Sequence, residues 1–245
     1  DIIYCVGISP QVLFAFKHAL LRDAIYSSLL KSSRRQMHAD IAAILETHFQ
    51  EVSETQPELL AHHYSEAGNH ELAVGFWYKS GQRALAHSAN VEAIAHFRKA
   101  LEALARWPDT AERAGQQIEL QLALGIPLIA VRGYAAEETR EVFARARALC
   151  LQLDDPAEYF QALYGLWGHS WMSGKNEEAL SMASEFLARA EASTDIVPMM
   201  VAHRVMGSTL LPIGQFQQSR LHFEQSIAMS KERGQQSLYN RYMVE

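Results

Sequence analysis

A helical-hairpin pattern returns along this chain at a nearly constant spacing. Between residues 162 and 190, small and apolar residues recur at helical spacing on both sides of the turn Ser173-Gly174-Lys175. A similar turn lies at Gly214, 40 residues after Gly174, and earlier ones lie at Gly133 and Ser88, at steps of 41 and 45 residues. One helical hairpin cannot bury both of its faces, so consecutive hairpins must stack on one another. The sequence therefore predicts an all-α repeat array.

Turn signals between the periodic segments set the expected helix limits. We expect helices at 57–67, 70–88, 90–105, 112–131, 135–153, 156–173, 176–191, 195–213 and 216–233. Short connections make successive helices antiparallel, and their stacking predicts an α-solenoid that forms a right-handed superhelix with one concave and one convex face. Pro127 removes one helical hydrogen bond and predicts a local bend.

Several glycines lie inside the expected helices, where each costs about 0.5–1 kcal/mol relative to alanine. They are Gly81, Gly125, Gly165, Gly168 and Gly207. A helix tolerates this cost where a neighbour must approach closely, and aromatic residues are available to fill the adjoining space. We expect that role for Trp77, Phe97, Phe143, Phe186 and Phe223.

The first fifty residues differ from the repeats. A short extended start at Phe14 precedes a helix with Leu20 and Ile25 on one face, and a second helix carries Met37, Ile41 and Ile44 at a spacing that predicts burial. The polar segment 51–57 reads as a linker that ends on Pro57, a residue suited to the first turn of a helix. We expect a first domain at 1–52, helical repeats at 57–233 and a tail at 234–245. The chain begins without methionine and ends while its apolar pattern continues, so we expect it to be part of a longer protein.

Composition restricts the possible partners. A formal net charge of −6 gives no basic surface for nucleic acid, so we expect no direct nucleic-acid binding. No run of about 18 consecutive apolar residues occurs, so we expect no membrane span. Cys5 and Cys150 cannot build a disulfide framework and lack metal-ligand spacing. We therefore expect a cytoplasmic location.

A turn glycine five residues before alanine or serine, as in Gly174/Ala179 and Gly214/Ser219, resembles tetratricopeptide repeats (TPRs), although the step of 40 to 45 residues exceeds their usual 34. A broader resemblance covers residues 12–230. The segment 16–46 resembles the end of the winged-helix module, and the segments 87–104, 120–150 and 166–180 the helical repeats, of bacterial AAA/STAND-type signalling ATPases, which are often fused to class III adenylate or guanylate cyclases.

That resemblance implies a regulatory arm whose catalytic domains lie outside this chain. No GxxxxGK[ST] phosphate loop occurs, and Gly174-Lys175 is followed by Asn176 in a turn between helices. We expect no catalytic, cofactor-binding or metal-binding residues here. The partner would be a protein, a peptide or the parent's own catalytic domains. An alternative is the arm of an ATPase-type transcriptional regulator.

Eleven histidines suggest another alternative, a metal-dependent enzyme. His62 and Glu66 have the spacing of two ligands on one helix face, but no third ligand is near in sequence. This hypothesis requires at least three residues of a larger set to converge on one pocket. The set is His62, His63, Glu66, His87 and His96.

A binding surface is the function that the repeats favour. The first helix of each stacked pair lines the concave groove, so its outward positions are candidates for partner contact. These are Tyr78, Gln82, Tyr164, His169, Trp171, Arg204 and Ser208. Aromatic residues, amides and arginine are typical of recognition surfaces. Tyr164 and Trp171 have an alternative role in packing against the next repeat.

Overall fold

The computed structural model describes residues 3–6, 13–153, 157–193 and 195–233. It divides into two compact units, Asp1–Phe76 and Trp77–Glu245, and we describe each by itself. The division falls within helix α5 (His70–Ala86).

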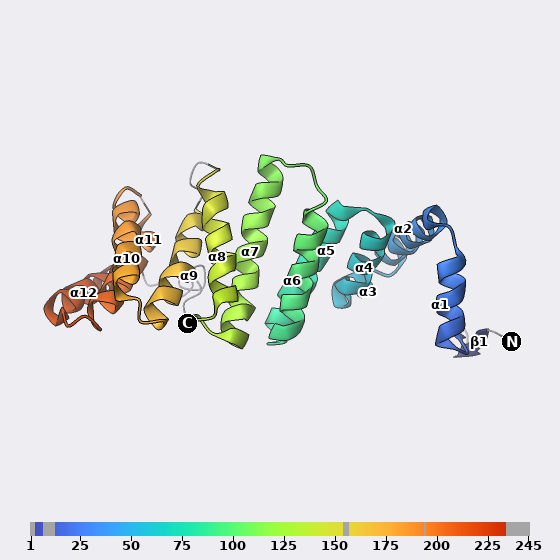
Figure 1. Ribbon diagram of the computed structural model, residues 1–245, viewed down its shortest axis with the longest axis horizontal. Coiled ribbons are helices and arrows are strands. Elements are labelled where there is room, and N and C mark those ends of the chain that lie inside the picture. The colour runs from blue at the N-terminus through green and yellow to red at the C-terminus, as the bar shows by residue number, and fades with distance from the viewer. Residues whose placement is uncertain (1–2, 7–12, 154–156, 194, 234–245) are drawn as a thin grey trace. The chain divides into compact units, whose positions relative to one another are not determined.

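Unit 1 combines a β-hairpin with helices (Figure 1). Strands β1 (Ile3–Val6) and β2 (Leu13–Phe16) pair antiparallel, with Ile3 opposite Phe16. Helices α1 (Ala19–Ser28), α2 (Lys31–His48), α3 (Gln50–Thr55) and α4 (Pro57–Ala67) follow. Strand β2 is the expected extended start. The fold among the described residues is otherwise helical.

Two predictions for unit 1 were wrong. Most of segment 51–57, expected as a linker, belongs to α3 (Gln50–Thr55), because no proline or glycine interrupts that helix and it packs against both α2 and α4. Helix α2 also turns a different face inward: Met37, Ile41 and Ile44 are exposed, whereas His38 and Ala42 are buried. His38 bonds to Tyr26 and His63, and these bonds compensate the burial of its ring. The apolar pattern of α2 does not predict them.

Unit 2 is a row of helices standing side by side (Figure 1). After α5 come α6 (Asn90–Leu104), α7 (Ala111–Arg132), α8 (Glu137–Cys150), α9 (Glu158–Met172), α10 (Asn176–Glu191), α11 (Ile196–Leu210) and α12 (Phe216–Arg233). From α6 onward each helix packs against the next one in sequence. These limits confirm the expected helices to within three residues at each end.

The turns repeat as the sequence predicts. Gly133, Gly174 and Gly214 all have positive φ, at 85°, 70° and 79°. Ser88, which stands at the same place in its hairpin, has a φ of 56° although it carries a side chain. A residue with positive φ therefore follows the first helix of each of these hairpins, α5, α7, α9 and α11, which we call the inner helices.

Aromatic rings fill the space that the helix-interior glycines leave. A Cβ atom added at Gly125 would lie 2.4 Å from Cζ of Phe143, and one at Gly165 would lie 2.4 Å from Cγ of the same ring. Phe143 is fully buried between them. Phe97 meets Gly81 and Phe223 meets Gly207 in the same manner, which confirms the expected close approaches at these glycines. Gly168 instead meets the ring of Tyr134, which was not among the expected aromatic residues.

Helix α7 passes through Pro127 without interruption. Within the part of the chain that the structure describes, α7 alone is long and apolar enough to cross a membrane by length and composition, with a mean hydropathy of 1.2. A central helix of a folded unit meets the same criteria, and α7 packs against α6 on one side and α8 on the other.

We expect Gly125→Ala to destabilise unit 2 by about 1–3 kcal/mol, because Phe143 must move out of a closely packed site. Gly115→Ala on the same helix is the matched control. A Cβ added at Gly115 would meet no neighbouring atom within 4 Å, so this substitution should stabilise the helix by about 0.5–1 kcal/mol. Chemical denaturation of both variants measures the two free energies of unfolding, and equal effects of the two substitutions would contradict this account.

Candidate functional site

A cavity of about 390 Å³ lies where α5, α6, α7 and α9 meet in unit 2. The predicted residues Tyr78 and Gln82 line it from α5. The remaining lining residues are Leu85, Phe97, Glu119, Leu122, Ala123, Ile126, Glu158 and Gln161. Apolar side chains thus form one part of the wall, and carboxylates and amides form the other.

A hydrogen-bond network connects α5 with α7 at this cavity. The Tyr78 hydroxyl donates to the Glu119 carboxylate, and the Gln82 side chain also bonds to that hydroxyl. Burial, followed by the hydrogen bond to Glu119, raises the pKa of Tyr78 far above its usual value. Tyr78 therefore remains a neutral donor that holds Glu119 in position.

A second group of predicted residues lies between α9 and α11. Nη2 of Arg204 donates to the Tyr164 hydroxyl at 2.9 Å, and the guanidinium carbon lies 5.4 Å from the Tyr164 ring centroid. Nε1 of Trp171 donates to the backbone carbonyl of Ser208 at 3.1 Å. Trp167 stacks on Trp171 with ring centroids 5.5 Å apart. Tyr164 and Trp171 therefore bond to the next inner helix, as the packing alternative expects.

His169 is not placed with these residues. Its side chain is buried, and Nδ1 lies 3.1 Å from the backbone oxygen of Tyr134, in the connection between α7 and α8. The adjacent Gly168 lies under the Tyr134 ring. His169 thus helps to fix this connection.

Sequence reasoning missed Glu119, Glu158 and Gln161. The repeat spacing could have found two of them, since Glu119 follows Tyr78 by 41 residues and Gln161 follows Glu119 by 42. Arg204 likewise follows Tyr164 by 40 residues, and the two side chains are hydrogen-bonded. Equivalent positions on successive inner helices become neighbours in the stack.

Two members of the histidine set proposed for a metal-dependent enzyme, His62 and His63, lie together in unit 1, with ring centroids 5.4 Å apart. Among the described residues, no group of three or more histidine, cysteine, aspartate or glutamate side chains is arranged to hold a metal ion. In unit 1, Nδ1 of His63 lies 2.8 Å from Nδ1 of the buried His38, whose Nε2 lies 2.9 Å from the Tyr26 hydroxyl. In unit 2, His87 bonds to a carbonyl of its own helix and His96 stacks on Trp77.

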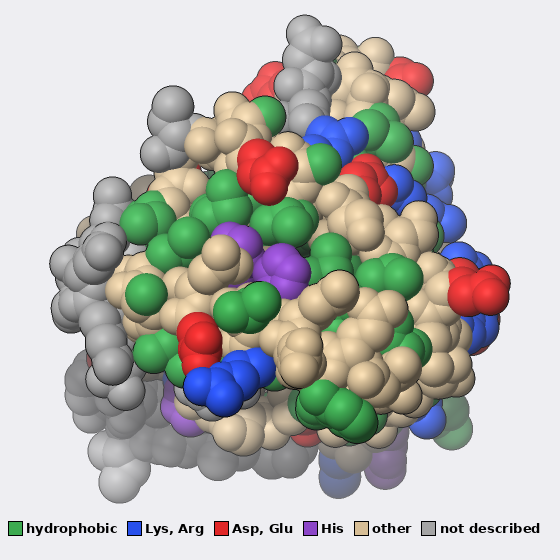
Figure 2. Space-filling model, turned by 90° about the vertical axis from the view of Figure 1, so that its left-hand side faces the viewer, with side chains coloured by type: hydrophobic (Ala, Val, Ile, Leu, Met, Phe, Trp, Pro, Cys, Tyr) green, Lys and Arg blue, Asp and Glu red, His purple; other side chains and the backbone are tan. Residues whose placement is uncertain are grey.

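A histidine pair connects the last two helices of unit 2. Nδ1 of His203 on α11 lies 2.9 Å from Nδ1 of His222 on α12. Figure 2 shows histidine side chains among hydrophobic ones on the face at this end of the molecule. Burial lowers the pKa of both residues, a charge on His222 lowers the pKa of His203 further, and Glu191 on α10 raises it. The folded protein therefore favours a neutral pair, in which one ring donates to the other.

We expect the free energy of unfolding to fall as pH decreases below about 6.5, because the unfolded chain then binds protons that the folded pair excludes. Each excess proton contributes a slope of up to about 1.4 kcal/mol per pH unit. His222→Gln should reduce this slope, whereas His87→Gln, at an exposed histidine outside the pair, should leave it unchanged. Denaturation of the three proteins at pH 7.5 and 5.5 tests this, and identical slopes for wild type and His222→Gln would refute it.

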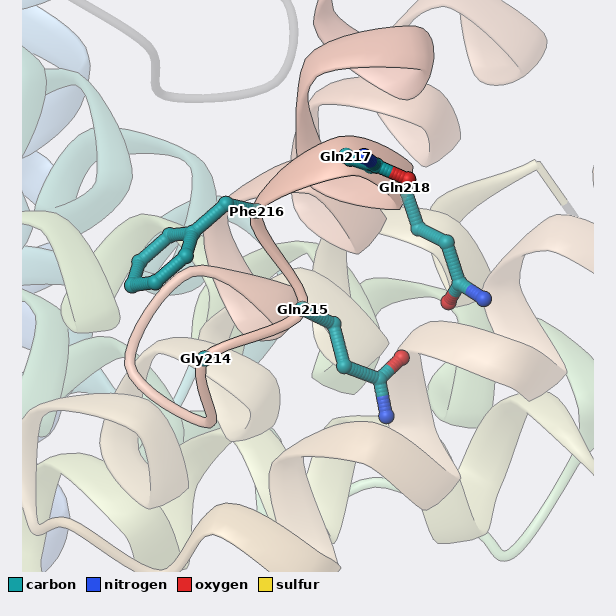
Figure 3. A pocket seen from close by; sticks show the side chains of 5 residues that line it. All are labelled: Gly214, Gln215, Phe216, Gln217 and Gln218. Carbon is teal, nitrogen blue, oxygen red and sulfur yellow. The ribbon is translucent and has the colours of Figure 1, made fainter.

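A smaller cavity of about 290 Å³ lies at the connection between α11 and α12. It is lined by Gly214, Gln215, Phe216, Gln217 and Gln218. Gln215 and Gln218 extend to one side and Phe216 to the other (Figure 3). Because five consecutive residues form it, it lacks the convergence of several helices that distinguishes the first cavity.

Comparisons with known proteins identify the fold. No family model matches the sequence, and no curated protein matches it. Among solved structures, BtubC from P. vanneervenii is similar over 89% of this chain and 93% of its own, with 14% identity and a TM-score of 0.58. A Podosopora anserina protein assigned to the kinesin light chains, with nearly identical TPR-like repeats, is similar over 84% of this chain and 99% of its own, with 13% identity and a TM-score of 0.60.

A third similar structure is a Rap protein complexed with competence and sporulation factor. The similarity covers 90% of this chain and 68% of the Rap chain, with 14% identity and a TM-score of 0.58. Together these likenesses confirm the predicted class: the chain is a TPR-like α-solenoid. At this level of identity the likeness concerns the fold, and the function must be argued from the site.

Proposed function

We propose that this chain is a non-catalytic interaction module that binds a protein or peptide partner along the inner helices α5, α7, α9 and α11. The cavity carries this proposal, because three inner helices bring apolar, amide and carboxylate groups to one place. Small pockets of mixed character with a few oriented polar groups are the usual form of a recognition site. The complex of the similarly folded Rap protein with competence and sporulation factor supports a partner of this class.

The proposal has a second part, which concerns signalling. The resemblance of residues 12–230 to the arms of AAA/STAND-type signalling ATPases supports a role as the regulatory arm of an ATPase or of an adenylate or guanylate cyclase. In that role the arm binds a partner in the cytoplasm and transmits its bound state to catalytic domains elsewhere. The negative net charge of −6 favours a protein partner over nucleic acid.

We expect Arg204→Ala to weaken peptide binding along the inner helices by about tenfold or more. The half-buried Arg204 has donors besides the one that bonds to Tyr164, and a hydrogen bond from a charged donor to the peptide contributes about 1.5–3 kcal/mol. The measurement is selection of random peptides displayed on phage against the chain, followed by titration of selected synthetic peptides. Arg220→Ala is the matched control, because Arg220 is an exposed arginine paired with Glu224 on α12. Equal binding of the selected peptides to wild type, Arg204→Ala and Arg220→Ala would contradict recognition along the inner helices.

The regulatory role is tested by nucleotide hydrolysis and cyclisation, measured for this chain and for the full-length protein that contains it. Activity of the full-length protein alone agrees with a regulatory arm. Turnover by the isolated chain that is lost on substitution of His62 and His63 would overturn the proposal.

A further inference from the structure

The cavity between α5, α7 and α9 has an uneven charge. Glu119 and Glu158 line it from two different helices, and none of its ten lining residues is lysine or arginine. Both carboxylates belong to exposed residues, so water compensates them when the cavity is unoccupied. A ligand that displaces this water must itself supply positive charge or hydrogen-bond donors.

The apolar part of the wall limits the shape of such a ligand. Phe97 and Leu122 are buried at the cavity, and Ile126 lies at its exposed side. A volume of about 390 Å³ is near the lower limit for a binding pocket, so it suits a single long side chain rather than a folded segment. Long basic side chains pack an apolar stem against such surfaces and place a charged head among polar groups.

One of the lining residues has a backbone acceptor without its usual helical donor. Pro127 has no N–H group, so the carbonyl of Ala123, four residues earlier, lacks its usual helical donor. Ala123 lines the cavity beside Glu119 on the preceding turn of α7. Two lining residues of α7 therefore carry hydrogen-bond acceptors, the side-chain carboxylate of Glu119 and the backbone carbonyl of Ala123.

From these observations we propose that the cavity binds the side chain of an arginine in the partner. The aliphatic stem packs against Leu122 and Ile126, and the guanidinium donates to Glu119, Glu158 and the Ala123 carbonyl. Arginine fits better than lysine because its planar group carries five donors in a fixed arrangement that matches several separate acceptors. Tyr78, which holds one oxygen of Glu119, keeps that carboxylate in place for the second contact.

This inference rests on the proposed interaction function and names the chemistry that one part of the partner must have. It is tested on the whole chain with N-acetyl-arginine-methylamide as the probe and with N-acetyl-citrulline-methylamide, its uncharged isostere, as the comparison. Chemical shifts of the Gln82 and Gln161 side-chain amides report on the cavity directly. We expect saturable shifts with the arginine probe and an affinity lower by about tenfold or more for the citrulline probe.

Substitution separates the cavity from the general negative charge of the chain. Glu119→Gln combined with Glu158→Gln should weaken binding of the arginine probe by about tenfold or more, whereas Glu102→Gln, at an exposed glutamate of α6 outside the cavity, should leave it unchanged. Pro127→Ala, which restores the helical donor to Ala123, should weaken binding by a smaller factor. Circular dichroism spectra of the variants show whether each remains folded.

Equal affinity for the two probes, or equal binding by wild type and the doubly substituted chain, would overturn the arginine assignment. If the binding of selected peptides still depends on Arg204 in that case, the interaction function is retained, with a different ligand chemistry at this cavity. If peptide binding does not depend on Arg204 but the arginine probe still binds at the cavity, the proposed wider binding surface is contradicted and this subsite is retained.

Discussion

The packing of Phe143 into the space left by two glycines sets the geometry of unit 2. The ring on α8 lies against Gly125 of α7 and Gly165 of α9, so one side chain fixes three consecutive helices. Because neither glycine has a side chain, the helices approach closely enough for equivalent positions on α7 and α9 to face one cavity. The cavity in turn depends on that approach, since Glu119 and Gln161 reach it from these two helices.

Much of unit 2 could be predicted from its sequence because local signals and tertiary packing agree there. Turn glycines mark the helix ends, and glycine and aromatic residues mark the close contacts. Unit 1 lacks this agreement. The apolar spacing of Met37, Ile41 and Ile44 indicates an inward face, yet α2 buries His38, which bonds to Tyr26 and His63. Hydrogen bonds between distant histidine and tyrosine side chains leave no periodic pattern, so hydrophobic periodicity alone selected the wrong face.

The candidate site was predictable in part for a similar reason. Tyr78 and Gln82 have outward positions on an inner helix, and the structure places both at the cavity. His169 has the same kind of position on α9 but is buried against the Tyr134 carbonyl, because the connection after α7 folds over Gly168. The conformation of a connection cannot be obtained from helical periodicity. Glu119 and Gln161, in contrast, follow from the repeat step itself once the alignment of successive helices is known.

Helix α7 carries three residues that weaken an isolated helix, and two of them, Gly125 and Pro127, flank the cavity-lining residue Ile126. Gly125 costs about 0.5–1 kcal/mol and Pro127 about 3 kcal/mol relative to alanine in a helix interior. Gly125 has a packing explanation, since it admits the Phe143 ring. Pro127 is buried, but an apolar residue of similar size could fill the same space without the loss of a hydrogen bond. Proline differs from such a residue because it has no N–H group and leaves the Ala123 carbonyl without its helical donor. Ala123 is one of the residues that line the cavity. Positions where a sequence departs from local preference without a gain in packing are where functional constraints are expected. The departure at Pro127 therefore supports the cavity, rather than the more exposed turn at Gly214–Gln218, as the binding site.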